Sequence, residues 1–220
     1  MSETVAETEY HSLHHMLSDA AWDFEKVRRE TARQADDLIG RPEAGLLLDE
    51  SGFEKKGDHS AGVDRQYNGR LGKVENSQVG VYAALAHGSM AAIIDFEWFL
   101  PKDWVADTKR CREAGIPESA QVFRSKPQMA AEMVKRARAA GVRFGFVGAD
   151  GLYGHATWLL FDGDDAGEVF ATEVHSDQQF YFADPGKAWV PAWEAREWAA
   201  RLKRKEWHPV ILRDGEKGEV

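Results

Sequence analysis

The sequence predicts an α/β fold with a mixed β-sheet. Two apolar, β-prone runs at residues 77–86 and 90–100 are joined by His87, Gly88 and Ser89, which indicates an antiparallel hairpin. The later apolar runs are separated by helical segments, and strand-helix-strand units favour parallel strands with a right-handed crossover. The 220 residues, 43% of them hydrophobic, are enough to bury the core of one domain with extensions.

The first half of the chain contains a helical segment and several strands. Residues 10–39 have apolar side chains at helical spacing, and a glycine and a proline follow them. The first strand is predicted at residues 44–49. Residues 51–60 are polar and glycine-rich, which predicts a loop, and residues 62–69 predict an extended piece that ends in an Asn-Gly turn.

The second half begins with a charged, irregular segment at residues 102–126 and continues with a strong helix, KPQMAAEMVKRARAAG. A short buried strand at residues 142–149 ends on Asp150. The remaining predicted elements are a helix at 155–161, a strand at 168–174, a helix at 193–203 and a strand at 208–212. This order predicts an N-terminal helical segment at 1–42, a core at 43–175 and an extension at 176–220.

The charge balance restricts how the protein binds nucleic acid. With 28 Lys and Arg against 37 Asp and Glu, the net charge is −9. This balance disfavours indiscriminate binding to nucleic acid, because phosphate contacts need concentrated positive charge. Local basic clusters occur at Lys55 and Lys56, at residues 109–112 and at residues 201–205, although short charge runs are usually solvated.

The composition also indicates a compartment. The single cysteine, Cys111, cannot form an internal disulfide, and no Cys/His array indicates a zinc site. The acidic N-terminus does not have the pattern of a signal peptide, and no apolar run approaches bilayer length. We therefore expect a cytoplasmic protein with no membrane partner.

Two aspartates mark the candidate site. Asp49 ends the first predicted strand and Asp150 ends the fourth, and the element order makes these strands plausible neighbours. Ligands bind outside the carboxyl ends of central strands in such sheets. Two adjacent carboxylates repel each other, so a divalent cation such as Mg²⁺ or Mn²⁺ would stabilise the pair and could support phosphodiester chemistry. The alternative is that each aspartate is only a helix cap or turn residue, and Asp150 before Gly151 fits that interpretation.

Longer motifs surround these aspartates. The segments DESGFEKKGDHSAGVDRQYNGRLGKVENSQVGVY, FLPKDW, RCREAGIP and VGADGLYG resemble the DDE-type transposases of bacterial insertion sequences, in the cut-and-paste group with a ribonuclease H-like catalytic domain. The resemblance extends from about Leu13 to Gly218. It implies a ribonuclease H-like mixed sheet, Asp49 and Asp150 as the first two metal-binding catalytic acids, Mg²⁺ as the ion, and double-stranded transposon ends as the substrate.

No segment of this sequence resembles the segment that carries the third acid of that family. In the family it is a glutamate on a helix that follows a long insertion, and no such segment is found here, so the chain resembles the N-terminal half of a transposase. Glu168, Glu173 and Glu216 are the nearest candidates by position, but none lies on a convincing helix facing the two aspartates. We expect an incomplete site unless a partner chain, for example in a homodimer, supplies the missing group.

Three hypotheses follow. The first is a transposase-like nuclease domain in which Asp49 and Asp150 hold the metal and basic residues lie near the DNA backbone; these are Lys55, Lys56, Arg65 and Lys73. The second is an inactive, truncated or domesticated derivative that binds DNA or a protein. The third is a phosphatase-like use of Asp49 as a nucleophile, which lacks the companion lysine and hydroxyl residues at recognisable places.

Overall fold

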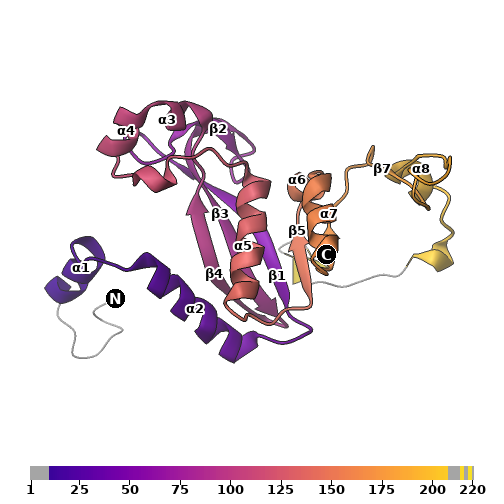
Figure 1. Cartoon of the computed structure of the whole chain (residues 1–220), viewed down its shortest axis with the longest axis horizontal. Helices are drawn as coiled ribbons and strands as arrows, with labels where there is room; N and C mark the ends of the chain where they lie inside the picture. Colours follow the sequence, from indigo (N-terminus) through magenta and orange to yellow (C-terminus); the bar gives the residue numbers. More distant parts are fainter. Residues whose placement is uncertain (1–9, 208–213, 216–217, 220) are drawn as a thin grey trace.

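The computed structural model describes residues 10–207, 214–215 and 218–219, and it confirms an α/β fold with a mixed sheet (Figure 1). The strands of the main sheet are β1 (Gly45–Glu54), β2 (Asp64–Asn68), β3 (Lys73–His87), β4 (Met90–Trp98), β5 (Phe146–Ala149) and β6 (Phe170–Thr172).

The strand order places β1 at the centre of the sheet. The order is β2-β3-β1-β5-β6, and β4 also pairs with β3. β1 is antiparallel to β3 and parallel to β5, and β6 is parallel to β5. The first and fourth strands of the sequence prediction are therefore direct neighbours, as expected. This antiparallel group followed by parallel strands agrees with the ribonuclease H-like fold class.

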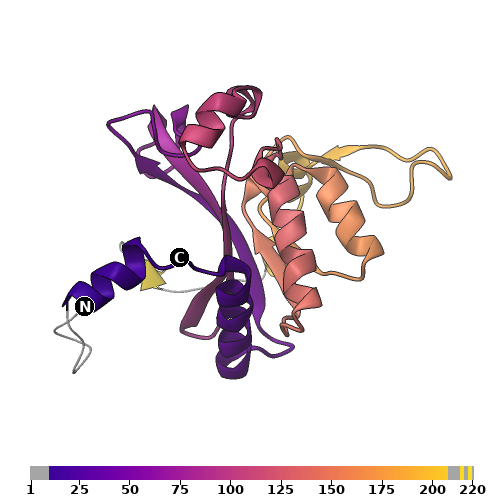
Figure 2. The same cartoon turned by 60° about the vertical axis from the view of Figure 1, so that its left-hand side comes forward.

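The α-helices are α1 (Tyr10–Ser18), α2 (Phe24–Ile39), α3 (Lys102–Ala106), α4 (Thr108–Glu113), α5 (Lys126–Ala139), α6 (Gly151–Gly154), α7 (Thr157–Asp165) and α8 (Ala195–Ala199). Four of the helices, α2, α5, α6 and α7, contribute to the core on one face of this sheet. α5 and α7 lie side by side against the sheet (Figure 2), and α2 packs along β4 and β3. No helix among the described residues is long and apolar enough to cross a membrane.

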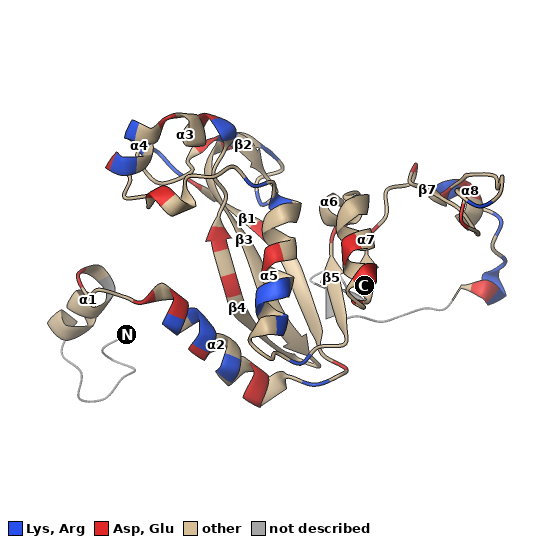
Figure 3. Ribbon diagram, in the orientation of Figure 1, with Lys and Arg blue, Asp and Glu red and all other residues tan. Residues whose placement is uncertain are grey.

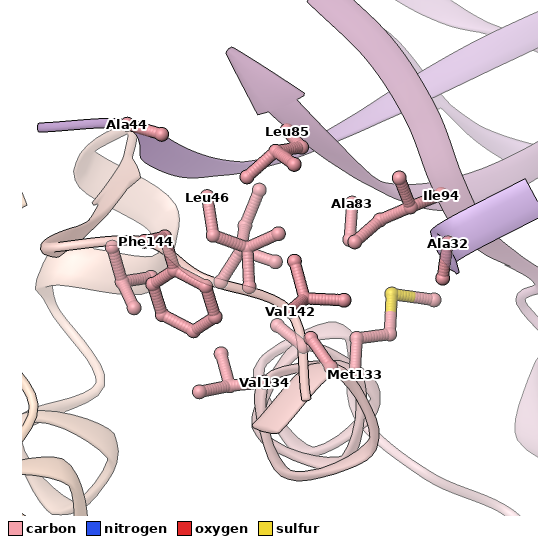
Figure 4. Close-up of a cluster of buried hydrophobic side chains, with 14 of the residues drawn as sticks. Ala32, Ala44, Leu46, Ala83, Leu85, Ile94, Met133, Val134, Val142 and Phe144 are labelled. Atoms are coloured by element: carbon pink, nitrogen blue, oxygen red, sulfur yellow. The ribbon is translucent and has the colours of Figure 1, made fainter. Parts of the chain in front are cut away.

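The core lies between the sheet and these helices. Leu46 from β1, Leu85 from β3 and Met133 from α5 are fully or almost fully buried in one cluster (Figure 4). Ala32 brings α2 into the same cluster, and Leu159 brings α7. Side chains alternate between the faces of a strand, so burial of Leu46 and Leu48 turns Leu47 and Asp49 toward the opposite face.

Local signals in the sequence explain where α5 begins and ends. Ser125 and Gln128 form a reciprocal capping box, and Pro127 occupies the first turn. Gly141 follows the helix with a positive φ of 78°, a conformation that favours glycine. The β3–β4 turn uses Gly88 in the same way, with φ at 60°. The predicted helix and the predicted hairpin are both confirmed.

Several predicted boundaries in the first half were wrong. Residues 51–60 were expected to form a loop, but β1 continues to Glu54 because β3 is long enough to pair with it as far as Ser77. The predicted helix at 10–39 is two helices separated by residues 19–23. Residues 102–126 were expected to be irregular but form α3, α4 and a 3₁₀ turn, Glu118–Ala120.

Boundaries in the second half also differ. The predicted strand at 142–149 pairs only from Phe146 onward, although Val142 and Phe144 are buried in the core. The helix expected at 193–203 is reduced to α8. Two further sheets have two strands each. One consists of β7 (Gln179–Phe180) and β8 (Trp193–Glu194), and the other of β9 (Asp214–Gly215) and β10 (Gly218–Glu219). The strand predicted at 208–212 lies outside the described residues.

Candidate functional site

The structure brings Asp49 and Asp150 together. Leu48 of β1 is in register with Ala149 of β5, so the two aspartates are the next residues on neighbouring parallel strands. Such strands lie about 4.8 Å apart. Asp150 has extended backbone angles, φ −77° and ψ −175°, so the alternation continues through it. Both carboxylates therefore lie on the sheet face opposite the helices.

The electrostatic environment of Asp49 is unfavourable for its charge. Partial burial raises the pKa of Asp49 above its ordinary value, and the negative charges of Glu50 and Asp150 raise it further. The Glu50 N–H, which donates to Asp49 Oδ1 at 2.7 Å, and the charge of Lys126 act in the opposite direction. Tyr82 lies directly across the sheet from Asp49 on β3. A cation beside Asp49 would therefore relieve a repulsion that the fold imposes.

Asp150 also has the structural role that the alternative interpretation predicts. It is the N-cap of α6, and its Oδ1 accepts a hydrogen bond from the Leu152 N–H at 3.0 Å. Its Oδ2 takes part in no hydrogen bond among the described residues. One oxygen thus fixes the side chain while the other remains available to a ligand.

The sequence interpretation did not assign roles to Glu50, Lys126 and Tyr153. Glu50 follows Asp49 and points to the helix-covered side of β1. Its Oε1 lies 2.9 Å from Lys126 Nζ, and its Oε2 accepts a hydrogen bond of 2.8 Å from the Tyr153 O–H. Burial, with the nearby charge of Glu50, raises the pKa of Tyr153. In the sequence, the adjacent Asp49 and Glu50 and the tyrosine of the ADGLYG segment could have indicated these contacts. Only the alternation of side chains along β1 shows that Asp49 and Glu50 face opposite sides of the sheet.

The candidates for a third acid lie in different places. Glu168 precedes β6, and both of its carboxylate oxygens bind Arg138 at 2.7 Å, so it is at the other end of that strand. Glu173 follows β6 beside Asp150, because Thr172 is in register with Ala149. It lines a shallow cavity of about 260 Å³ with Asp150 and His175. Glu216 lies outside the described residues.

The aspartate pair fits a hard divalent cation with an open coordination sphere. Across residues 10–207, with the two short terminal pieces, no three Asp, Glu, His or Cys side chains are arranged to hold a metal ion. Mg²⁺, however, is commonly bound by one or two carboxylates together with water and substrate phosphates. The oxygen donors of Asp49 and Asp150 suit Mg²⁺ or Mn²⁺ in that way.

The four predicted DNA contacts lie at one end of the sheet. Lys55 follows β1, and Arg65 lies on β2. Asn76 of β3 lies between them, because its carbonyl oxygen accepts a hydrogen bond from the Lys55 N–H and its backbone is in register with Arg65. Lys56 and Lys73 are exposed in the same region. Figure 3 shows that basic and acidic residues are mixed near β2, α3 and α4. Lys73 Nζ lies 2.9 Å from Glu75 Oε2, and this hydrogen bond raises the pKa of Lys73. Lys55 is six positions after Asp49, which corresponds to about 20 Å along an extended strand.

The loop after β1 is held by side chains that donate to its carbonyl oxygens. The bonds run from Asn76 to Lys55 (2.7 Å) and Gly57 (3.0 Å), from Gln78 to Ala61 (2.8 Å), and from Arg110 to Asp58 (3.0 Å). Arg110 also stacks on Trp104 at 3.8 Å, and the Trp104 indole N–H donates to the Val63 carbonyl at 2.8 Å. Arg110, part of a basic cluster in the sequence, therefore stabilises this loop.

Comparison with known proteins identifies the family. The family model described as "DDE superfamily endonuclease" matches residues 1–218 of the chain. The chain belongs to the DDE superfamily of endonucleases. The resemblance noted in the sequence is thus confirmed, and endonucleases of this superfamily generally use divalent metal ions.

One curated relative extends this comparison. The chain is 35% identical over 147 residues to a probable transposase for insertion sequence element IS701 from Microchaete diplosiphon. The alignment covers 66% of this chain and 35% of the relative, so the DDE endonuclease chain spans about a third of that protein. No solved structure matches the chain.

Proposed function

We propose that this DDE endonuclease chain is the metal-binding, DNA-cleaving part of an insertion-sequence transposase, with Asp49 and Asp150 as ligands of Mg²⁺ or Mn²⁺. The observation that carries the proposal is the position of these aspartates at equivalent points of neighbouring parallel strands, on one face of the sheet. Cytoplasmic location and the division at residues 1–42, 43–175 and 176–220 belong to the same proposal.

The residues of the chain would prepare the site in a simple way. The N–H groups of Glu50 and Leu152 each hold one carboxylate oxygen, which orients Asp49 and Asp150. A divalent cation, when bound, supplies Lewis-acid stabilisation and lowers the pKa of a water or hydroxyl nucleophile. The remaining carboxylate oxygens and the phosphodiester would then meet on the face opposite the helices.

The proposed DNA contacts are Lys55, Lys56, Arg65 and Lys73. Lys55, about 20 Å along the sheet from Asp49, would lie about six nucleotides from the scissile phosphate, since successive phosphates are about 3.4 Å apart along the helix axis. The loop that carries Lys55 and Lys56 is fixed by Asn76 and Arg110. A loop whose backbone is already held in place loses less freedom on binding, which favours recognition of double-stranded transposon ends.

A second candidate function is a DNA- or protein-binding derivative that does not cleave. Its support is that no third Asp, Glu, His or Cys completes a metal cluster with the two aspartates in the part of the chain described. In a transposase the third acid could also come from a second copy of the chain. Sedimentation with and without DNA measures that assembly.

Metal titration and strand cleavage separate these functions. Calorimetry with Mn²⁺ should show binding that Asp49→Ala and Asp150→Ala each abolish, and transposon-end DNA should be nicked in Mg²⁺ or Mn²⁺. No nicking, together with weak metal binding that does not depend on Asp49 and Asp150, supports the binding derivative. Cleavage that survives both substitutions in one chain would remove the proposal.

A further inference from the structure

Glu50 connects the strand that carries Asp49 with two helices on the covered face of the sheet. It lies on β1, Lys126 begins α5, and Tyr153 lies in α6. Both oxygens of the Glu50 carboxylate have a donor, at 2.9 Å from Lys126 Nζ and 2.8 Å from the Tyr153 hydroxyl. The Glu50 and Lys126 side chains are only 22% and 20% exposed, and Tyr153 is fully buried. A carboxylate that already has two donors, one of them a cation, is poorly placed to bind a metal.

The bond to Tyr153 links the chain segments that carry Asp49 and Asp150. Glu50 follows Asp49 directly, and Tyr153 lies three residues after Asp150 in the single helical turn that Asp150 caps. The other side of this turn is also restricted. A side chain at Gly154 would place its Cβ 2.4 Å from the Glu173 carbonyl oxygen. The turn is therefore held between β1 and the end of β6, with little freedom to move toward or away from Asp49.

Asp49 and Glu50 lie on opposite faces of β1. Asp49 presents its carboxylate on the open face, and Glu50 presents its own to the helices. The Glu50–Tyr153 bond thus acts on the separation of Asp49 and Asp150 from the side opposite their carboxylates. Groups that hydrogen-bond directly to metal ligands change metal affinity about 10- to 100-fold when they are removed, and we expect the Glu50–Tyr153 bond, which acts one step further away, to lie at the lower end of that range.

We propose that Glu50 is a positioning residue, which through Tyr153 sets the separation of Asp49 and Asp150 and so the affinity of the pair for a divalent cation. This inference rests on the proposed function, because it assumes that the pair binds the ion. It assigns to Glu50 and Tyr153 no contact with the ion or with DNA.

Calorimetric titration of the full chain with Mn²⁺ tests this role. Tyr153→Phe and Glu50→Ala should each bind Mn²⁺ at least about tenfold more weakly than the wild type. Glu50→Gln should bind nearly as well, because its amide oxygen accepts from Lys126 while its N–H₂ donates to the tyrosine oxygen. Rescue by glutamine separates positioning from a requirement for the charge.

A matched control removes a buried hydrogen bond elsewhere. Ser77→Ala deletes the Asn68–Ser77 bond of 3.0 Å at the β2 end of the sheet and should leave Mn²⁺ affinity unchanged. If Tyr153→Phe does not fold, the Glu50→Ala and Glu50→Gln pair decides the question.

The outcomes distinguish this inference from the proposed function. Wild-type affinity in both Glu50→Ala and Tyr153→Phe, with binding still lost in Asp49→Ala, would overturn the positioning role alone. Equal loss in Glu50→Ala and Glu50→Gln would also overturn it, in favour of a direct role for the Glu50 charge. No Asp-dependent binding by the wild type would overturn the proposed function and this inference with it.

Discussion

Asn76→Ala tests whether the loop after β1 binds DNA as a preorganised unit. The substitution deletes two hydrogen bonds to loop carbonyls, of 2.7 Å to Lys55 and 3.0 Å to Gly57, and leaves every basic side chain in place. A hydrogen bond of this kind contributes about 1 kcal/mol, so the loop loses at most about 2 kcal/mol of ordering. Each 1.4 kcal/mol is about tenfold in affinity, which gives a 5- to 30-fold weaker complex if DNA binding must restore that order.

Fluorescence anisotropy with labelled transposon-end DNA, at several salt concentrations, separates order from charge. Asn76→Ala should weaken binding without changing the slope of log K against log salt, since the number of phosphate contacts is unchanged. Lys55→Ala with Lys56→Ala should reduce the magnitude of that slope by about 2, because each phosphate contact contributes about 0.9.

Gln121→Ala is a matched control for Asn76→Ala. Its side-chain amide also donates to a loop carbonyl, that of Ile116 at 2.9 Å, but no proposed DNA contact lies in that loop. DNA affinity should therefore stay at the wild-type level. Wild-type affinity in Asn76→Ala, or a salt slope reduced as in the lysine variant, would refute the reasoning.

Four further predictions concern stability and the site. Asp49→Asn should be slightly more stable than the wild type at neutral pH. The folded-state pKa of Asp49 is raised above the ordinary value of 3.8, so the wild type loses stability as pH rises from 3.8 through the folded-state pKa. Urea unfolding should show that the difference between the two proteins disappears below pH 3.8. Arg136→Met should lower the free energy of unfolding by about 3 kcal/mol in urea titrations, because it leaves Asp95, 6% exposed, without its 2.8 Å partner; a loss under 1 kcal/mol would contradict this. Gly154→Ala should destabilise by about 1–3 kcal/mol, since its Cβ would meet a backbone oxygen at 2.4 Å, whereas Gly69→Ala, with open space around it, should be nearly neutral in the same thermal melts. Glu168→Gln should leave calorimetric Mn²⁺ affinity unchanged, because Glu168 binds Arg138 at the opposite end of β6, and a weakened affinity would place it in the site after all.

The sequence predicted the parts of the fold that depend on local chemistry. Ser125 and Gly141 mark the ends of α5, and Gly88 marks the β3–β4 turn, because capping and positive φ act within a few residues. The extent of β1 was not predictable in the same way. Residues 51–54 contain one apolar residue, Phe53, among Ser51, Gly52 and Glu54, and they become a strand because β3 offers backbone groups opposite them.

The candidate site was predictable as a pair but not as a network. The element order was enough to place Asp49 and Asp150 side by side on neighbouring parallel strands, although Asp49 lies within β1 and not at its end. The partners of Glu50 are 76 and 103 residues away, at Lys126 and Tyr153, and such distant contacts leave no periodic signal in one sequence. Asn76 likewise looks like an ordinary polar strand residue until the path of the loop beside it is known.

The excess of acidic residues is compatible with DNA binding because of where the ion pairs lie. On the helix-covered side, arginines are paired with carboxylates, as in Arg124 with Glu97 and Arg136 with Asp95. At the end of the sheet, Lys55, Lys56 and Arg65 make no ion pair within the described residues. The net charge of −9 therefore does not by itself describe the end of the sheet that we propose to bind DNA. Arginine substitutions among the helices should act on stability, and lysine substitutions beside β1 on the salt dependence of DNA binding.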